Sequence, residues 1–196
     1  MKRLVVLVSG GGSNLQALID ACADGRIAAE IILVLSNRAD AYALQRANRA
    51  GIPVALKTLT SELVQGGTRT SYDFALAQAV AEARPDLVVL AGWMHILDEA
   101  FLVACPAKVI NLHPALPGAF PGTHAIERAL AAYQCGEIVE SGVMVHEVIA
   151  EIDAGPVLGT EVVPIQPADD ITSLSARMHR AEHRLLVDVV CRMVGT

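Results

Sequence analysis

The chain has 196 residues, of which 53% are hydrophobic and only 4% aromatic, and its formal net charge is −6 at pH 7. This length fits one domain, residues 1–196, with an aliphatic core large enough to fold by itself. The acidic balance argues against nucleic acid as the main partner, because binding a phosphate backbone calls for clustered Lys and Arg. Any anionic ligand must therefore be bound by a local site.

The first residues predict a strand rather than a targeting or membrane segment. Residues 4–8 are apolar, but the chain turns polar and glycine-rich at Ser9. A signal peptide needs about 7 to 15 apolar residues and a membrane helix about 20. The four cysteines include no C-x-x-C pair, which argues against a zinc knuckle or a disulfide framework. We expect a cytoplasmic protein with reduced thiols and no membrane contact.

Short apolar runs alternate with helical patterns up to Asn111. The runs are rich in Val, Ile and Leu, and they predict buried strands at residues 4–8, 31–35, 54–56, 87–91 and 109–111. Amphipathic segments between them predict helices at residues 14–23, 41–50 and 71–83. This alternation is typical of a parallel sheet with crossover helices.

The pattern changes after Asn111. The remaining predicted elements are a proline- and glycine-rich loop at residues 114–122, a helix at 124–133, strands at 142–148 and 157–164, and a helix at 171–194. The two strands are joined by a turn at residues 153–156, so they form an antiparallel pair at one edge. The predicted fold class is α/β: a doubly wound, mostly parallel, Rossmann-like sheet with an antiparallel strand pair at the C-terminal side.

The segment SGGGSN, residues 9–14, lies between the first strand and the first helix. Glycine lets the backbone approach a ligand closely, and the free N–H groups of a helix start attract an anion. A dinucleotide fingerprint would need a small residue where Leu15 stands and an acidic residue after the second strand, and neither is present. No Walker A Lys-Ser/Thr pair follows. The segment favours a monophosphate; the alternative is a plain turn in which Ser13 or Asn14 caps the helix.

Asn111 and His113 stand at the end of a predicted central strand, within the segment NLHP. Open α/β sheets bind ligands outside the carboxyl ends of their strands. The two residues are two positions apart, so in extended backbone their side chains point the same way. An amide and an imidazole on one side could both donate hydrogen bonds to an oxyanion. The alternative is a histidine that is hydrogen-bonded within a loop.

Two further segments are ambiguous when taken alone. Asp153 lies in the turn EIDAGP and by itself is an ordinary turn aspartate. On the last helix, His179, Glu182 and His183 match the H-x-x-E-H pattern of one group of zinc peptidases. A third protein ligand would have to follow, and only Asp188 remains before the end of the sequence. We therefore expect no metal, and an exposed polar helix face is the simpler interpretation.

Taken together, the motifs resemble those of a known family. The segments SGGGSN (residues 9–14), AGWMHIL (91–97), NLHP (111–114) with Pro121 and Gly122, and DAGPV (153–157) resemble, in order and spacing, the phosphoribosylglycinamide formyltransferases of purine biosynthesis. The resemblance runs from Val5 to about Leu186. It implies transfer of a formyl group from 10-formyltetrahydrofolate to the amine of glycinamide ribonucleotide, which bears one phosphate.

Carried over onto the matching positions, the resemblance implies three groups of site residues. The catalytic group is Asn111, His113 and Asp153. The substrate group is Gly12, Ser13, Asn14, His179, Arg180 and Glu182, with Glu182 at the ribose hydroxyls. The group at the folate is Arg69, Met94, His95, Ile96, Leu97, Asn111, Ile149 and Asp153. The implied partners are the two small-molecule substrates, with no metal and no nucleic acid, and a homodimer stays open.

Two positions depart from the family pattern. His95 stands where many members carry Arg, which removes a fixed positive charge from the folate site. Residues 115–120 read ALPGAF, where the commoner form is Ser-Leu-Leu-Pro followed by two residues. The spacing from His113 to Gly122 is intact, so we expect the loop to keep its course.

The implied chemistry is acyl transfer. The amine attacks the formyl carbon, and negative charge collects on the formyl oxygen. Asn111 and His113 would donate hydrogen bonds to that oxygen, while Asp153 would keep His113 protonated and help a water carry the proton from the amine. No metal and no covalent intermediate are required.

Three alternatives share the sheet but not the reaction. A formyltetrahydrofolate hydrolase passes the formyl group to water, and a methionyl-tRNA formyltransferase passes it to a charged tRNA. The first usually has an extra N-terminal domain and the second a basic C-terminal one, and neither extension fits into 196 residues. The third, a non-catalytic nucleotide-binding module, would not need Asn111, His113 and Asp153.

Overall fold

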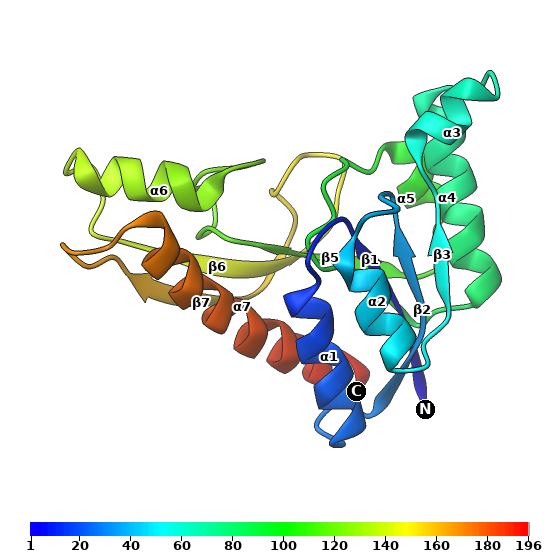
Figure 1. The fold of residues 1–196 in the computed structure, drawn as a ribbon, viewed down its shortest axis with the longest axis horizontal. Coiled ribbons are helices and arrows are strands. Elements are labelled where there is room, and N and C mark those ends of the chain that lie inside the picture. The colour runs from blue at the N-terminus through cyan, green and yellow to red at the C-terminus, as the bar shows by residue number, and fades with distance from the viewer. Residues whose placement is uncertain (196) are drawn as a thin grey trace.

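The computed structural model describes residues 1–195, whose strands form a single seven-stranded sheet (Figure 1). The strands are β1 (Lys2–Val8), β2 (Ala29–Ser36), β3 (Val54–Leu56), β4 (Leu87–Leu90), β5 (Lys108–His113), β6 (Glu140–Glu147) and β7 (Val157–Pro164). Their order across the sheet is β3-β2-β1-β4-β5-β6-β7. The strands from β1 to β5 pair in parallel, whereas β6 is antiparallel to both β5 and β7. The predicted fold class is confirmed.

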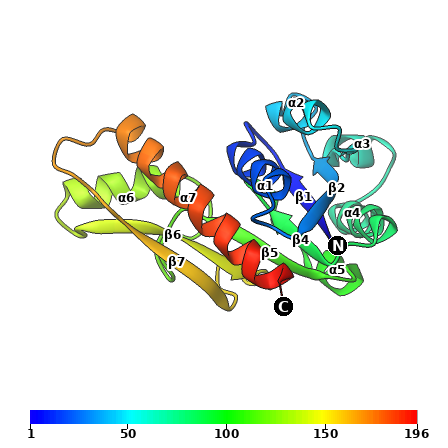
Figure 2. The same cartoon turned by 90° about the horizontal axis from the view of Figure 1, so that it is seen from below.

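Helices cover both faces of the sheet (Figures 1 and 2). They are α1 (Ser13–Ala23), α2 (Tyr42–Arg49), α3 (Leu59–Val64), α4 (Arg69–Ala83), α5 (Glu99–Ala104), α6 (Ala125–Gln134) and α7 (Ile171–Val194). Buried residues of α1, α2, α6 and α7 belong to one core cluster, and those of α4 and α5 belong to another. The long helix α7 packs on β6 and β7 and also contacts α1 (Figure 2). Within residues 1–195, no helix combines the length and the apolar character needed to cross a membrane.

Strand β1 explains why the core divides into two clusters. Leu4, Val6 and Val8 belong to one cluster, Val5 and Leu7 belong to the other, and none of the five is exposed at all. Successive side chains of a strand point to opposite faces of the sheet. A continuous apolar run is therefore buried only where helices cover both faces, which is why such runs predict a doubly wound sheet.

The differences from the predicted elements are local. Helices α3 and α5 are absent from the prediction because six residues are too few to show a helical period. Each begins with a polar cap: the side chains of Thr58 and Asp98 accept hydrogen bonds from backbone N–H groups of the first turn. Strand β5 continues past the predicted end at Asn111 to His113, because it pairs with β6 there.

Candidate active site

A cavity of about 500 Å³ lies where the parallel strands end. Its lining comes from the residues that follow β1, β4 and β5, from the turn after β6, and from α7. Strand β1 has β2 on one side and β4 on the other, so the direction of the crossovers reverses at this point. Open α/β sheets bind ligands at such a switch point.

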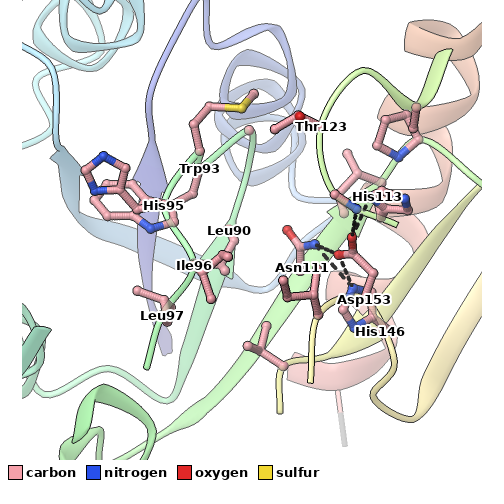
Figure 3. Close-up of a pocket in the computed structure, with 18 of the residues that line it drawn as sticks. Leu90, Trp93, His95, Ile96, Leu97, Asn111, His113, Thr123, His146 and Asp153 are labelled. Atoms are coloured by element: carbon pink, nitrogen blue, oxygen red, sulfur yellow. Dashed lines mark hydrogen bonds and ion pairs between the residues drawn. The ribbon is translucent and has the colours of Figure 1, made fainter. Parts of the chain in front are cut away.

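Asn111, His113 and Asp153 come together on one wall of this cavity (Figure 3). Asn111 and His113 are two residues apart on β5, and both face the same carboxylate. Asp153 Oδ1 accepts a hydrogen bond from Asn111 Nδ2 at 3.2 Å, and Asp153 Oδ2 lies 3.3 Å from His113 Nδ1. The turn after β6 thus delivers a carboxylate that links the two β5 side chains.

His146 belongs to this group and is missing from the residues predicted from the sequence. It lies on β6 directly opposite Asn111 in the strand pairing, and its side chain is buried. Its Nδ1 is 2.9 Å from the carbonyl oxygen of Glu147, which can only accept, so Nδ1 carries the proton. Nε2 lies 3.2 Å from Asn111 Nδ2 and 3.5 Å from Asp153 Oδ1. It therefore accepts from the amide in the neutral ring and pairs with the carboxylate when the ring is protonated. The signal in the sequence that could have indicated His146 is a single histidine among the apolar residues of a predicted strand.

The donors of this group are occupied in the present state. The N–H bonds of the Asn111 amide serve Asp153 and His146, and the amide oxygen points away from Asp153 (Figure 3). Both ring nitrogens of His113 face acceptors, because Nε2 is 3.1 Å from the Phe120 carbonyl oxygen. From the sequence we expect these two groups to present donors to a substrate. In the structure a substrate oxygen has to displace one of their partners first.

Burial sets the protonation of His113. Desolvation lowers the pKa of His113 below its ordinary value, and the charges of His146 and Arg128 act in the same direction. The Asp153 carboxylate and the Phe120 carbonyl oppose this shift without reversing it. The imidazole is therefore mainly neutral at neutral pH. The Asp153 charge acts in the predicted direction but does not outweigh the loss of hydration, so protonation of His113 through this contact stays a prediction for titration to test.

Asp153 remains a carboxylate. Burial acts to raise the pKa of Asp153, but the contact with His146, the hydrogen bond from the Gly122 N–H and the charge of His113 together lower it. The Gly122 bond measures 2.8 Å to Oδ2. The site thus holds a buried negative charge beside a neutral imidazole. Such a pair can take up a proton with little rearrangement.

Backbone strain is concentrated around this group. Of the non-glycine residues with positive φ among residues 1–195, Phe120 (φ 47°), His124 (φ 58°) and Asp153 (φ 52°) all lie at or beside the cavity. Each such conformation costs on the order of 1–3 kcal/mol and persists only where the surroundings enforce it. The loop and the turn are therefore held in specific shapes by their contacts.

Gly155 explains the sequence of the turn that carries Asp153. A Cβ at this position would lie only 1.8 Å from the carbonyl oxygen of Glu147. Glu147 N–H also donates to the Pro156 carbonyl at 2.9 Å, which fastens the turn to the end of β6. Only glycine fits this close approach. The segment Asp-Ala-Gly-Pro thus brings the carboxylate of Asp153 back over β5.

The glycine-rich segment folds as a tight entry into α1. Gly12 occupies the N-cap with φ 71°, and a Cβ there would lie 2.6 Å from the Cβ of Ala43 on α2. The alternative in which Ser13 or Asn14 caps the helix is therefore wrong. Asn14 lines the cavity, whereas Gly12 and Ser13 are outside the lining that the described residues form. A glycine N-cap supplies no side chain, so the first N–H groups of α1 are left for an anion.

Helix α7 contributes His179 and Glu182 to the same part of the cavity. Glu182 is buried, and its Oε2 accepts a hydrogen bond from Asn14 Nδ2 at 3.0 Å. Arg180 is exposed and outside the lining. Within residues 1–195, no three His, Cys, Asp or Glu residues are grouped so that they could hold a metal ion. The H-x-x-E-H pattern instead places a buried carboxylate beside the start of α1.

The facing wall of the cavity is largely apolar (Figure 3). Met94, His95, Ile96, Leu97 and Ile149 all line the cavity, as predicted for the folate group. Met94 and Ile96 are exposed, so their side chains are available for a ligand, whereas Leu97 is buried. This wall offers apolar contact surface opposite the polar Asn111 group.

The structure does not place Arg69 and His95 as cations that would contact the folate directly. Arg69 is absent from the lining formed by residues 1–195; its guanidinium donates to the buried Asp73 at 2.7 Å and to the Ile96 carbonyl, and so supports the wall from behind. The His95 ring packs edge-on against Tyr72 and Trp93, with centroids 6.0 and 5.8 Å away. Burial and then the charge of Arg69 lower the pKa of His95. His95 therefore presents a neutral aromatic ring.

The fold and the site define a formyl transferase, since the family model of that description matches residues 2–190. The phosphoribosylglycinamide formyltransferase of Schizosaccharomyces pombe is 48% identical, over 97% of this chain and 96% of that protein. The Escherichia coli enzyme of the same name is 41% identical, over 93% and 82%. The crystal structure of glycinamide ribonucleotide transformylase 1 from Symbiobacterium toebii has a TM-score of 0.92 at 37% identity, covering 100% of this chain and 88% of that one. The chain belongs to the phosphoribosylglycinamide formyltransferase family.

Proposed function

We propose that this chain transfers the formyl group of 10-formyltetrahydrofolate to the amine of N1-(5-phospho-D-ribosyl)glycinamide, giving the N-formyl product and tetrahydrofolate in purine biosynthesis. The observation that carries this proposal is the joining of three surfaces in one cavity. Asn14 and Glu182 supply polar groups beside a helix start, residues 94–97 supply an apolar wall, and Asn111, His113 and Asp153 supply groups for proton transfer.

The ribonucleotide binds at the start of α1. Its phosphate takes the free N–H groups at residues 12–14, where the helix dipole favours a negative charge. The Glu182 carboxylate accepts hydrogen bonds from ribose hydroxyls, and Asn14 keeps that carboxylate in place. His179 and the exposed Arg180 add donors at the same end of α7. This arrangement leaves the glycinamide amine directed toward Asn111.

The folate binds along the apolar wall. Its pterin ring packs between Met94, Ile96 and Leu97 on one side and Ile149 on the other, with the neutral ring of His95 beside it. Arg69 acts indirectly, by holding the Ile96 carbonyl. Burial of this flat ring gives affinity, and polar groups of the backbone give its orientation.

The chemical step needs a proton carrier and donors for an oxyanion. The amine attacks the formyl carbon, a C–N bond forms, and the carbonyl oxygen becomes negative. His113, neutral at the outset, takes the amine proton through a water and returns it to the folate nitrogen as the old C–N bond breaks. Ionised Asp153 stabilises the imidazolium formed in between. The Asn111 amide exchanges one of its present acceptors for the formyl oxygen.

The scheme calls for neither a metal ion nor a covalent intermediate, and its partners are two small molecules rather than nucleic acid. We place the reaction in the cytoplasm, and a homodimer stays open. Hydrolysis of the formyl folate, formylation of a tRNA and a non-catalytic nucleotide-binding role are not favoured, because the similar proteins named above carry the name of the transferase.

The first prediction is that folate turnover depends on the ribonucleotide amine. The purified protein is incubated with 10-formyltetrahydrofolate, with and without the ribonucleotide, and tetrahydrofolate release is followed. We expect release only when both substrates are present, because the amine is the nucleophile. Equal release without the amine would identify a hydrolase. No release in either reaction would refute the enzymatic proposal.

A second prediction separates the two ends of the cavity. Asn14→Ala removes the hydrogen bond to the buried Glu182 carboxylate. A hydrogen bond to a charged group contributes about 1.5–3 kcal/mol, so ribonucleotide affinity should fall about 10- to 100-fold. Folate affinity should stay unchanged. Calorimetry with each ligand measures both values, and Asp20→Asn, on the exposed side of α1, is the matched control.

Equal losses of both affinities in Asn14→Ala would show that the residue only maintains the fold. Unchanged ribonucleotide affinity would show that Glu182 needs no support from Asn14. Either result would remove the Asn14 side chain from the proposed substrate site.

A further inference from the structure

The loop at residues 114–122 contacts the Asn111 group at two points. The Phe120 carbonyl oxygen lies 3.1 Å from His113 Nε2, and the Gly122 N–H donates to Asp153 Oδ2 at 2.8 Å. His113 and Asp153 are themselves 3.3 Å apart. The position of this short loop therefore fixes both partners of the ion pair that forms when His113 is protonated.

Arg128 holds this loop from the first turns of α6. Its Nη2 donates hydrogen bonds to the carbonyl oxygens of Phe120 and Pro121, each at 2.6 Å. The guanidinium also lies over the Phe120 ring, 5.8 Å from its centroid. Arg128 can serve as a fixed point because its neighbours Ala129 and Leu130 are buried in the core.

Phe120 and Pro121 would not keep their backbone conformation without the contacts from Arg128. Phe120 has φ 47°, in the left-handed region that non-glycine residues rarely adopt. It also precedes Pro121, which narrows its backbone choices further. A strained residue persists only where the surrounding structure over-determines it. The paired hydrogen bonds and the ring contact from Arg128 supply that restraint at the strained residue itself.

We propose that Arg128 is a positioning residue for the formyl transfer: by fastening the Phe120 and Pro121 carbonyls, it keeps His113 and Asp153 in register with each other. The proposal rests on the proposed function of the cavity. Arg128 lies outside the lining that the described residues give the cavity, and its guanidinium contacts Phe120 and Pro121 of the loop. Its effect on the reaction therefore passes through loop geometry.

The charge of Arg128 gives the proposal a second readout. The groups that face His113 are Asp153 from the turn after β6, His146 from β6 and Arg128 from α6, together with the Phe120 carbonyl. The Arg128 cation disfavours protonation of His113, and burial beneath the loop acts in the same direction. Loss of the cation and of burial raises the pKa of His113, whereas loss of the Phe120 hydrogen bond and of the register with Asp153 lowers it. A loosened loop should therefore shift this pKa.

The test compares Arg128→Gln, Arg128→Lys and the control Arg26→Gln, whose arginine pairs with Asp24 on the surface. For Arg128→Gln we expect kcat to fall on the order of 10²-fold, the effect of a misplacement of about 1 Å, with KM for both substrates nearly unchanged. Arg128→Lys keeps a cation that can donate to the carbonyls and should recover part of the loss. Arg26→Gln should match the wild type.

An NMR titration of His113 in the same variants needs no turnover, so it tests the positioning role even if the proposed reaction fails. The pKa of His113 should move away from the wild-type value in Arg128→Gln and stay closer to it in Arg128→Lys. An unchanged pKa would overturn the proposal, and so would an unchanged kcat. A raised ribonucleotide KM with unchanged kcat would also overturn it, since Arg128 would then be a binding contact. Equal losses of kcat in Arg128→Gln and Arg128→Lys would show that a cation that donates to the Phe120 and Pro121 carbonyls does not position the loop.

Discussion

Asp153→Asn should lower kcat by about 10²- to 10⁴-fold while the Kd of each ligand stays near the wild-type value. The Asp153 carboxylate accepts hydrogen bonds from Asn111 and Gly122. It also lies beside the imidazole rings of His113 and His146. Because Asp153 has a lowered pKa, it is ionised when the imidazolium forms and stabilises that charge. The phosphate, the ribose and the pterin ring bind elsewhere in the cavity, so kcat rather than affinity should change.

Asp153→Asn also places a hydrogen-bond donor where the Asp153 carboxylate now accepts from the Asn111 amide. The Gly122 N–H is fixed by the backbone, so the oxygen of an introduced Asn turns toward it. The new NH2 group then faces Asn111 and His146, and the Asn111 amide must rotate to accept from it. The donor proposed for the formyl oxygen is thereby lost together with the charge. Both effects lower kcat.

The direction of the His113 titration checks the electrostatic part. Removal of a neighbouring negative charge makes protonation harder, so the pKa of His113 should fall further in Asp153→Asn, as read by NMR. Asp86→Asn, at the opposite end of the sheet, removes a carboxylate that pairs with Lys2 and should leave both readouts unchanged. A His113 pKa that stays constant or rises in Asp153→Asn would show that the two side chains are uncoupled. Asp153 would then be an ordinary turn residue.

The fold could be predicted because burial on two faces leaves a direct trace in the sequence. The apolar runs at β1 and β4 have to be covered on both sides, and only a doubly wound sheet does this. The short helices α3 and α5 left no such trace, since six residues do not complete two turns. Their caps at Thr58 and Asp98 are equally common at turns.

The site could be predicted in part. Asn111 and His113 share a strand, so their common direction follows from the two-residue period alone. Asp153 was reached through the resemblance, because its position depends on the close approach of Gly155 to β6, which no local pattern reveals. His146 was missed because its role comes from the pairing of β6 with β5, a contact between distant segments. The neutral state of His113 likewise depends on burial, which is a property of the folded chain.

Asn111→Ala should lower kcat by about 10²- to 10³-fold, the usual loss for one oxyanion donor, and should hardly change the Kd of either ligand. Unlike Asp153→Asn, it leaves the contact between His113 and Asp153 in place, so the pKa of His113 should not fall. The two readouts therefore separate the donor from the carboxylate that orients it.

The double variant Asn111→Ala/Asp153→Asn decides whether the two residues act as a unit. Asp153 holds the Asn111 amide by a hydrogen bond at 3.2 Å, so replacing Asp153 already disables the amide as an oriented donor. We expect the double variant to lose less activity than the product of the two single losses, because residues that share one task are not additive. Losses that multiply in full would mean that Asn111 donates to the formyl oxygen without help from Asp153. The link between β5 and the turn after β6 would then stabilise the fold without contributing to the reaction.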